Sequence, residues 1–104
     1  MTSGGNECVG LAELLEKAGL VQNMVDGTLG WSFFGEARDQ GGVLYHVTLD
    51  ARADTTFSGK WKYFVHIYAE PKHKKHITTI DDTSVLGAVR KFAAFLGKEA
   101  VVTA

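Results

Sequence analysis

Residues 60–70 read KWKYFVHIYAE, and their alternation of side chains decides the fold that we expect for the whole chain. Successive side chains of an extended strand point to opposite faces, so a period of two predicts a strand with two different faces. One face would carry Trp61, Tyr63, Val65, Ile67 and Ala69. The other face would carry Lys62, Phe64, His66, Tyr68 and Glu70. The pattern is typical of an antiparallel strand with one face against a core.

Further strand signals flank this stretch. Residues 43–52 alternate in the same way, and residues 30–38 are rich in aromatic side chains. The four residues between them, 39–42 (DQGG), favour a turn because glycine adopts positive φ without strain. Pro71 ends the strand at 60–70, since proline cannot donate to a ladder, and residues 76–80 predict a short fourth strand. Short connections between these strands favour antiparallel neighbours.

Amphipathic helices are predicted at both ends of the chain. Apolar residues recur at three- and four-residue spacings over 8–19, and again over 85–96. A glycine follows each pattern and is a stop signal. Residues 81–84 (DDTS) are typical of a helix start, because their side chains can cap the first backbone N–H groups. Residues 20–29 show neither pattern, and we expect them to form a connection.

The predicted fold is therefore α+β and two-layered, with an antiparallel three- or four-stranded sheet flanked by the N-terminal and C-terminal helices. Residues 1–7 are expected to form a flexible N-terminal tail, and residues 8–100 a single domain. The predicted core consists of Leu14, Leu15, Val47, Leu49, Trp61, Val65, Ile67, Val89, Phe92 and Leu96.

Length and composition restrict the function classes. The chain has 104 residues, of which 45% are hydrophobic and 22% charged, and this balance is typical of one globular domain. Cys8 is the only cysteine, so an internal disulfide is excluded and a reducing compartment is favoured. The N-terminal residues lack the pattern of a secretory signal, and no apolar run reaches the ~20 residues of a membrane helix. We expect a cytoplasmic protein without membrane contact.

Charge is divided unevenly between the two halves of the chain. Residues 1–54 contain eight acids and three bases, whereas residues 55–104 contain four acids and eight bases. Most of the bases lie between Lys60 and His76, together with three of the four histidines. Such a stripe attracts an anionic partner, but the net charge of −1 counts against a dedicated DNA-binding protein.

The polar face of the strand at 60–70, extended by its neighbours and by the basic run that follows, is the candidate contact surface. Its predicted binding residues are His46, Arg52, Lys62, Phe64, His66, Tyr68, Lys72, His73, Lys74, Lys75 and His76. Rings with a charged rim are typical of protein interfaces. We therefore predict a small non-catalytic binding protein that acts by protein–protein interaction. It would be an inhibitor, adaptor or regulatory subunit, for example of the phage- or plasmid-type anti-defence class.

Three alternatives involve the same residues. Rings and cations on one sheet face also suit single-stranded nucleic acid, since bases stack on rings at ~1–3 kcal/mol each and cations hold the phosphates. A second copy of the chain is another candidate partner, in a homodimer. Finally, Phe64 and Tyr68 could be buried under a helix or a loop, because aromatic residues favour strands without any ligand.

Metal binding and catalysis have little support in the sequence. His73-x-x-His76 has the spacing of a ligand pair, but lysines flank it, and a zinc site needs about four ligands. No phosphate-binding loop, G-x-S-x-G or H-E-x-x-H motif is present. We expect no metal, no cofactor and no enzymatic activity.

Overall fold

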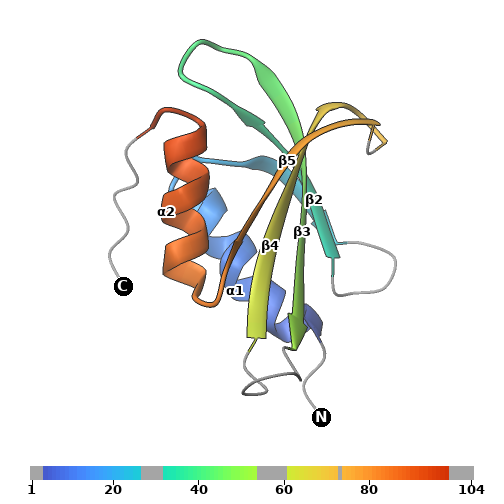
Figure 1. The fold of residues 1–104 in the computed structure, drawn as a ribbon, viewed down its shortest axis with the longest axis vertical. Coiled ribbons are helices and arrows are strands. Elements are labelled where there is room, and N and C mark those ends of the chain that lie inside the picture. Colours follow the sequence, from blue (N-terminus) through green and yellow to red (C-terminus); the bar gives the residue numbers. More distant parts are fainter. Residues whose placement is uncertain (1–3, 27–31, 54–60, 73, 99–104) are drawn as a thin grey trace.

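Five antiparallel strands form one sheet in the order in which they occur in the chain. The computed structural model describes residues 4–26, 32–53, 61–72 and 74–98 (Figure 1). The elements are α1 (Gly4–Lys17), β1 (Gln22–Asp26), β2 (Ser32–Arg38), β3 (Leu44–Ala53), β4 (Trp61–Glu70), β5 (Lys74–Asp82) and α2 (Val85–Phe95). The predicted α+β class and the two flanking helices are confirmed, while the sheet has five strands instead of three or four.

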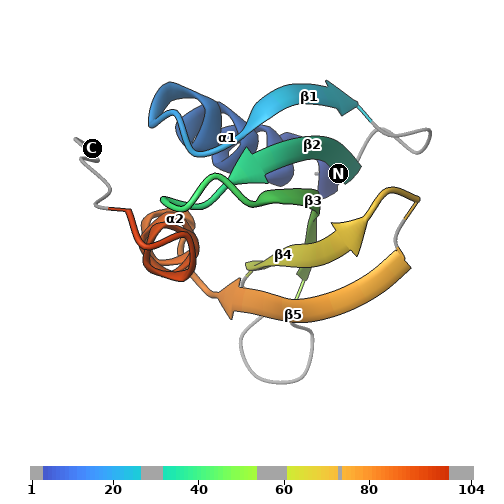
Figure 2. The same cartoon turned by 90° about the horizontal axis from the view of Figure 1, so that it is seen from above.

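Both helices cover the same face of the sheet, which we call the inner face. α1 contacts α2, β1, β2, β3 and β4, and α2 also contacts β4 and β5. Figures 1 and 2 show the two helices next to each other, with the strands curving past them. No helix among the described residues covers the opposite face, which we call the outer face.

The pairing of β3 with β4 confirms the predicted alternation. Val47 lies opposite Ile67, and Leu49 lies opposite Val65. All four side chains are buried on the inner face. Burial of an aliphatic side chain of this size stabilises the fold by about 1.5–3 kcal/mol, so a slip of one residue would lose most of the core.

Eight of the ten predicted core residues are buried, namely Leu15, Val47, Leu49, Val65, Ile67, Val89, Phe92 and Leu96. The other two, Leu14 and Trp61, are half-buried and pack against the edge of this core. The core also contains Leu11 from α1 and Ala88 and Ala93 from α2, which bring the helix axes close to the sheet.

Helix α1 begins at Gly4, whereas the sequence pattern predicted a start at residue 8. Cys8 and Leu11 are fully buried, and this placement requires helical backbone on both sides of Cys8. Glycine is tolerated in the first turn because the N–H groups there have no partner within the helix. The predicted stop is confirmed, since the helix ends at Lys17 and Gly19 adopts a φ of +71°.

Strand β1 lies within residues 20–29, where the sequence predicted only a connection. It is short and polar, and its register against β2 shifts between Gln22 and Val25. Asn23 lies in this irregular part with a φ of +57°, a conformation that asparagine adopts more readily than most residues. A strand of this kind has no clean period of two, so pattern analysis does not detect it.

Strand β5 is longer than the predicted strand at 76–80, and it includes Asp81 and Asp82. The cap of α2 is Ser84, whose Oγ accepts a hydrogen bond from the Gly87 N–H at 2.9 Å. Asp82 Oδ1 in turn accepts from the Ser84 N–H at 2.8 Å. The helix ends at Phe95, and Gly97 has a φ of +71°, as its predicted role as a stop requires.

The turn between β2 and β3 is held by one carboxylate. Asp39 Oδ1 accepts hydrogen bonds from the N–H groups of Gly41 and Val43, both at 2.9 Å, and Gly42 adopts a φ of +86°. The hydrogen bond from Val43 is the largest cause of a lowered pKa at Asp39, and it outweighs the effect of burial. The predicted turn at 39–42 is confirmed.

Candidate functional site

The outer face carries alternate side chains of the inner three strands and of β5. Cross-strand pairing brings Thr48, His66 and Thr79 into one row, and Asp50, Phe64 and Asp81 into the next. The third row consists of His46, Tyr68 and His76. The predicted binding residues His46, Arg52, Lys62, Phe64, His66, Tyr68 and His76 therefore all belong to one surface.

Phe64 lies near the middle of this surface and is half-buried. The Arg52 guanidinium lies 5.3 Å from its ring centroid, and the Lys62 ammonium lies 5.9 Å from it. The His66 ring is nearly parallel to it, with 6.0 Å between centroids and an angle of 5°. Cation–π contacts at exposed sites contribute about 0.5–1 kcal/mol each, so these neighbours fix the position of the ring.

A chain of hydrogen bonds crosses the outer face beside Phe64. His66 Nε2 lies 3.2 Å from Asp50 Oδ2, and His66 Nδ1 lies 3.0 Å from Thr79 Oγ1. His76 Nε2 lies 2.8 Å from the same Thr79 oxygen. Both nitrogens of His66 therefore have partners, which fixes the orientation of its ring. The His76 ring also makes an edge contact with Tyr68, with 5.4 Å between centroids.

Asp50 carries the negative charge at one end of this series of hydrogen bonds. Burial raises the pKa of Asp50, but the hydrogen bond and charge of His66 and the nearby Arg52 guanidinium outweigh that effect and lower the pKa overall. The side chain of Asp50 is 21% exposed, and its Oδ2 lies 3.4 Å from the Arg52 guanidinium. Asp50 therefore stays ionised near neutral pH and neutralises the cation beside Phe64.

The cations of the outer face have acidic partners. Arg52 pairs with Asp50, and the Lys62 ammonium lies 3.3 Å from Asp81 Oδ2. Glu36 adds a further acid on β2. The sequence predicted a basic sheet face, but Asp50 and Asp81 neutralise two of its bases, so the described centre of this face is close to neutral. The reason is that the antiparallel order places acidic side chains of β3 and β5 on either side of the bases of β4.

The basic run lies at one end of the sheet, at the turn between β4 and β5. Lys72 and Lys75 adopt φ values of 62° and 55°, and Lys75 pairs with Glu70 at 3.3 Å. Lys72 and Lys74 are exposed and have no acidic partner among the described residues. His73 lies outside the described residues. The run begins in a turn, as predicted, but continues into β5.

Both edges of the sheet are unsuited to the addition of another strand. β1 is short and irregular, as described above, and β5 has a register shift opposite Ile67 and Tyr68. The Lys91 ammonium also donates to the Asp81 carbonyl oxygen of β5 at 2.8 Å. Bulges and lysines are common devices that protect sheet edges. These features hinder strand addition at the edges, so the outer face is the candidate contact surface.

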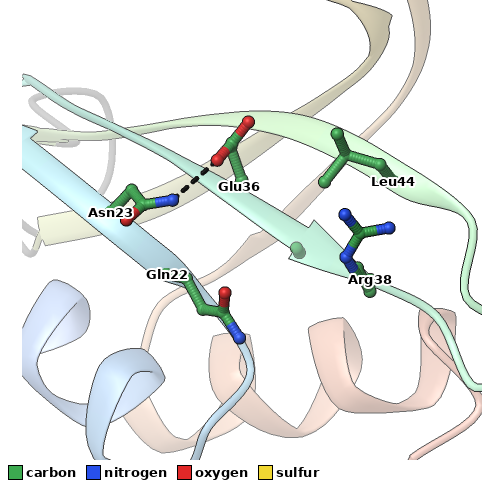
Figure 3. Close-up of a pocket in the computed structure, with 6 residues that line it drawn as sticks. Gln22, Asn23, Glu36, Arg38 and Leu44 are labelled. Atoms are coloured by element: carbon green, nitrogen blue, oxygen red, sulfur yellow. Dashed lines mark hydrogen bonds between the residues drawn. The ribbon is translucent and has the colours of Figure 1, made fainter.

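A hollow of about 130 Å³ lies where β1, β2 and β3 meet (Figure 3). Its charged groups already have partners, since the Asn23 amide donates to Glu36 Oε1 at 2.7 Å and the Arg38 guanidinium donates to the Gly42 carbonyl oxygen at 3.1 Å. Gln22, Ala37 and Leu44 complete its lining. The hollow does not present a set of unpaired polar groups that converge on a ligand, so it does not define a small-molecule site.

The metal-ligating side chains of the described residues do not form a metal site. Within the described residues, no three His, Cys, Asp or Glu side chains are placed to hold a metal ion. Cys8 is a buried thiol in the core. None of the helices in the described part of the chain has the length and apolar character needed to span a bilayer.

Sequence reasoning missed three members of the site, namely Asp50, Thr79 and Asp81. Asp50 could have been found, because the alternation of β3 places it on the same face as His46 and Arg52. Thr79 and Asp81 could not, because their row positions depend on the register shift in β5.

No protein-family model, curated protein sequence or solved structure shows a significant match to this chain.

Proposed function

We propose that this protein is a non-catalytic binding protein, an inhibitor, adaptor or regulatory subunit, whose outer sheet face docks against another protein. The observation that carries the proposal is the position of Phe64 and Tyr68. Both rings are half-buried on the face opposite α1 and α2, among charged and histidine side chains. A central group of rings with a charged rim matches the composition of protein interfaces.

Charge at the rim indicates the chemistry of the partner. Lys72 and Lys74 are exposed at one end of the surface and lack acidic partners among the described residues, whereas Arg52 and Lys62 near its centre are paired. A complementary partner would present an apolar centre to the rings and acidic side chains to the turn between β4 and β5. Such complementarity fixes orientation and association rate more than affinity.

The same pairing favours a protein over nucleic acid. Binding to nucleic acid depends on cations that neutralise phosphates, and each carboxylate beside a cation weakens that attraction. Asp50 and Asp81 are placed in this way next to Arg52 and Lys62. The ring of Phe64 is also bracketed by its own neighbours, which leaves less of it for a base to stack on.

Capture from a nuclease-treated extract of the native cells tests the proposal through matched variants. We expect a protein that binds stoichiometrically to the wild type and to Val9→Ala, an exposed apolar residue of α1, and is retained about tenfold less by Phe64→Ala. Lys72→Ala with Lys74→Ala should also weaken retention. Lys17→Ala with Arg90→Ala, which removes the same charge from the helices, should not.

The purified partner then distinguishes the two classes of ligand. A protein interface should lose less than about tenfold in affinity between 50 and 200 mM salt, whereas six to ten phosphate contacts would cost about 10³–10⁵. Retention that is unchanged by Phe64→Ala, or that disappears with nuclease treatment, would contradict the proposal. The second result would favour the nucleic-acid alternative.

A further inference from the structure

We propose that the hydrogen-bond chain His76–Thr79–His66–Asp50 is a proton-operated element that releases the docked partner when the pH falls below neutral. The inference rests on the proposed function, because the chain lies on the proposed docking surface. Its four members span β3, β4 and β5 and are joined by contacts of 2.8, 3.0 and 3.2 Å.

When both histidines are neutral, the three hydrogen bonds have one consistent donor-to-acceptor direction. An ionised Asp50 only accepts hydrogen bonds, so the His66 Nε2 nitrogen carries the proton and donates to it. His66 Nδ1 then has a lone pair, and the Thr79 hydroxyl donates to it. The Thr79 oxygen can therefore accept from the protonated Nε2 of His76. Every donor in this form has an acceptor.

One added proton can be accommodated if the donor and acceptor roles at Thr79 are exchanged. A protonated His66 donates from Nδ1 to the Thr79 oxygen, and its positive charge lies against the Asp50 carboxylate. The Thr79 hydroxyl then donates to His76 Nε2, which must be the unprotonated nitrogen of a neutral ring. Histidine is the side chain that ordinarily changes charge in the physiological pH range, so a pair of linked histidines suits a response to mild acid.

A second proton is not accommodated. Both histidines would then donate to the single oxygen of Thr79, and the Thr79 proton would lose its acceptor within the chain. Two positive rings would be separated by one oxygen atom. Because His76 is exposed and lies on the edge strand β5, it is the ring that can turn away. That movement would break its edge contact with Tyr68.

The charged groups around His66 come from all three strands. β3 supplies Asp50 and Arg52, β4 supplies Lys62, and β5 supplies Asp81 and His76. Arg52 and Lys62 oppose a positive charge at this position, while Asp50 and Asp81 favour it. Glu70, in the row next to His76, is already paired with Lys75 at 3.3 Å, so no described carboxylate beside His76 is left for the second proton.

Docking depends on the protonation of the chain because an interface removes water from it. A paired His66–Asp50 unit can be buried, whereas an unpaired imidazolium at His76 would have to lose its hydration. We therefore expect the partner to bind more weakly at pH 5.5 than at pH 7.5, by about tenfold or more.

The coupling is measurable on the protein alone, by NMR titration of the histidine rings. In the wild type, protonation of one ring should oppose protonation of the other, so the chemical shifts of His66 and His76 should not follow independent curves. His76→Gln, which keeps a donor for Thr79 but cannot titrate, should leave a single step at His66. Thr79→Val should also remove the coupling. Thr78→Val, the neighbouring threonine of β5, is the matched control and should leave the coupling unchanged.

The partner supplies the second measurement. His76→Gln should bind equally well at pH 5.5 and 7.5, whereas His46→Gln, on the same face but outside the chain, should keep the pH dependence of the wild type. Independent titration of His66 and His76, unaffected by Thr79→Val, would overturn the inference even if the docking surface is correct. A coupled titration without any partner that depends on Phe64 would instead refute the proposed function and leave the proton coupling established.

Discussion

A pair of glycine-to-alanine substitutions tests the local structure with opposite expected signs. Gly10 and Gly87 both lie within helices, where alanine is ordinarily more favourable than glycine by about 1 kcal/mol. A Cβ atom at Gly10 would have nothing within 4 Å. A Cβ atom at Gly87 would lie 2.5 Å from the carboxylate of Asp82. Helix propensity alone predicts that both changes stabilise the protein.

The structure predicts that Gly87→Ala destabilises it. To make room, the Asp82 carboxylate must rotate away from hydrogen bonds with the Ser84 N–H and hydroxyl at 2.8 and 3.2 Å, and from the Lys91 ammonium at 3.1 Å. The two hydrogen bonds to the ionised oxygen contribute about 2–3 kcal/mol together, and the half-exposed ion pair adds little to this. After the gain in helix propensity, the net loss is about 1–2 kcal/mol.

Urea denaturation at pH 7 measures both effects. We expect Gly10→Ala to raise the free energy of unfolding by about 0.5–1 kcal/mol and Gly87→Ala to lower it by about 1–2 kcal/mol. In the background of Asp82→Ala, the Gly87→Ala change should become neutral or stabilising, because its obstacle has been removed. If Gly87→Ala stabilises the wild type as much as Gly10→Ala does, the placement of Asp82 over the start of α2 is wrong.

Three further changes test the core, the turn and the close packing of β1 on β2. Phe64→Ala should cost about 1–2 kcal/mol in unfolding free energy, against about 3–5 kcal/mol for the buried Phe92→Ala, and equal losses would show that Phe64 belongs to a core. Asp39→Asn should destabilise the protein at pH 7 and 5. Because the Val43 hydrogen bond lowers the folded pKa of Asp39, this contribution is present above the ordinary value of 3.8 and is lost as the pH falls through the folded pKa, so the urea midpoints of the two proteins should converge as the pH is lowered below 3.8. Gly35→Ala should cost about 1–3 kcal/mol, since a Cβ there would collide with Met24 Sδ and lie 3.0 Å from the Gln22 carbonyl oxygen; a thermal midpoint equal to that of the wild type would contradict the packing of β1.

Much of the fold could be predicted because its central strands obey a period of two. The alternation in β3 and β4 identified Val47, Leu49, Val65 and Ile67 as one buried face, and the same count placed Phe64 on the other. β1 could not be predicted in this way, because an edge strand that packs few of its side chains has little need for alternation. Its existence depends on the main-chain hydrogen bonds that β2 offers.

The candidate site was only partly visible in the sequence for a related reason. Which residues share a face follows from one strand at a time, but which side chains touch depends on the register between strands. The meeting of His66 with Thr79 requires the shift in β5 opposite Ile67 and Tyr68. Without that shift, Thr78 would lie opposite His66, and Thr79 would lie opposite the buried Val65.

Folding determines where the unevenly distributed charges of the two halves lie in space. An antiparallel order brings the end of the acidic half against the start of the basic half, so Asp50 of β3 lies next to the bases around Phe64. On this face the contact between His66 and Asp50 joins the two halves, whereas the pairs Arg52–Asp50 and Lys62–Asp81 each lie within one half. The charge left over is at the turn between β4 and β5, where Lys72 and Lys74 lie beyond the reach of β3. An acidic partner would therefore be oriented from that end, while the nearly neutral rings and histidines at the centre provide the affinity, which is why salt should change the rate of docking more than its strength.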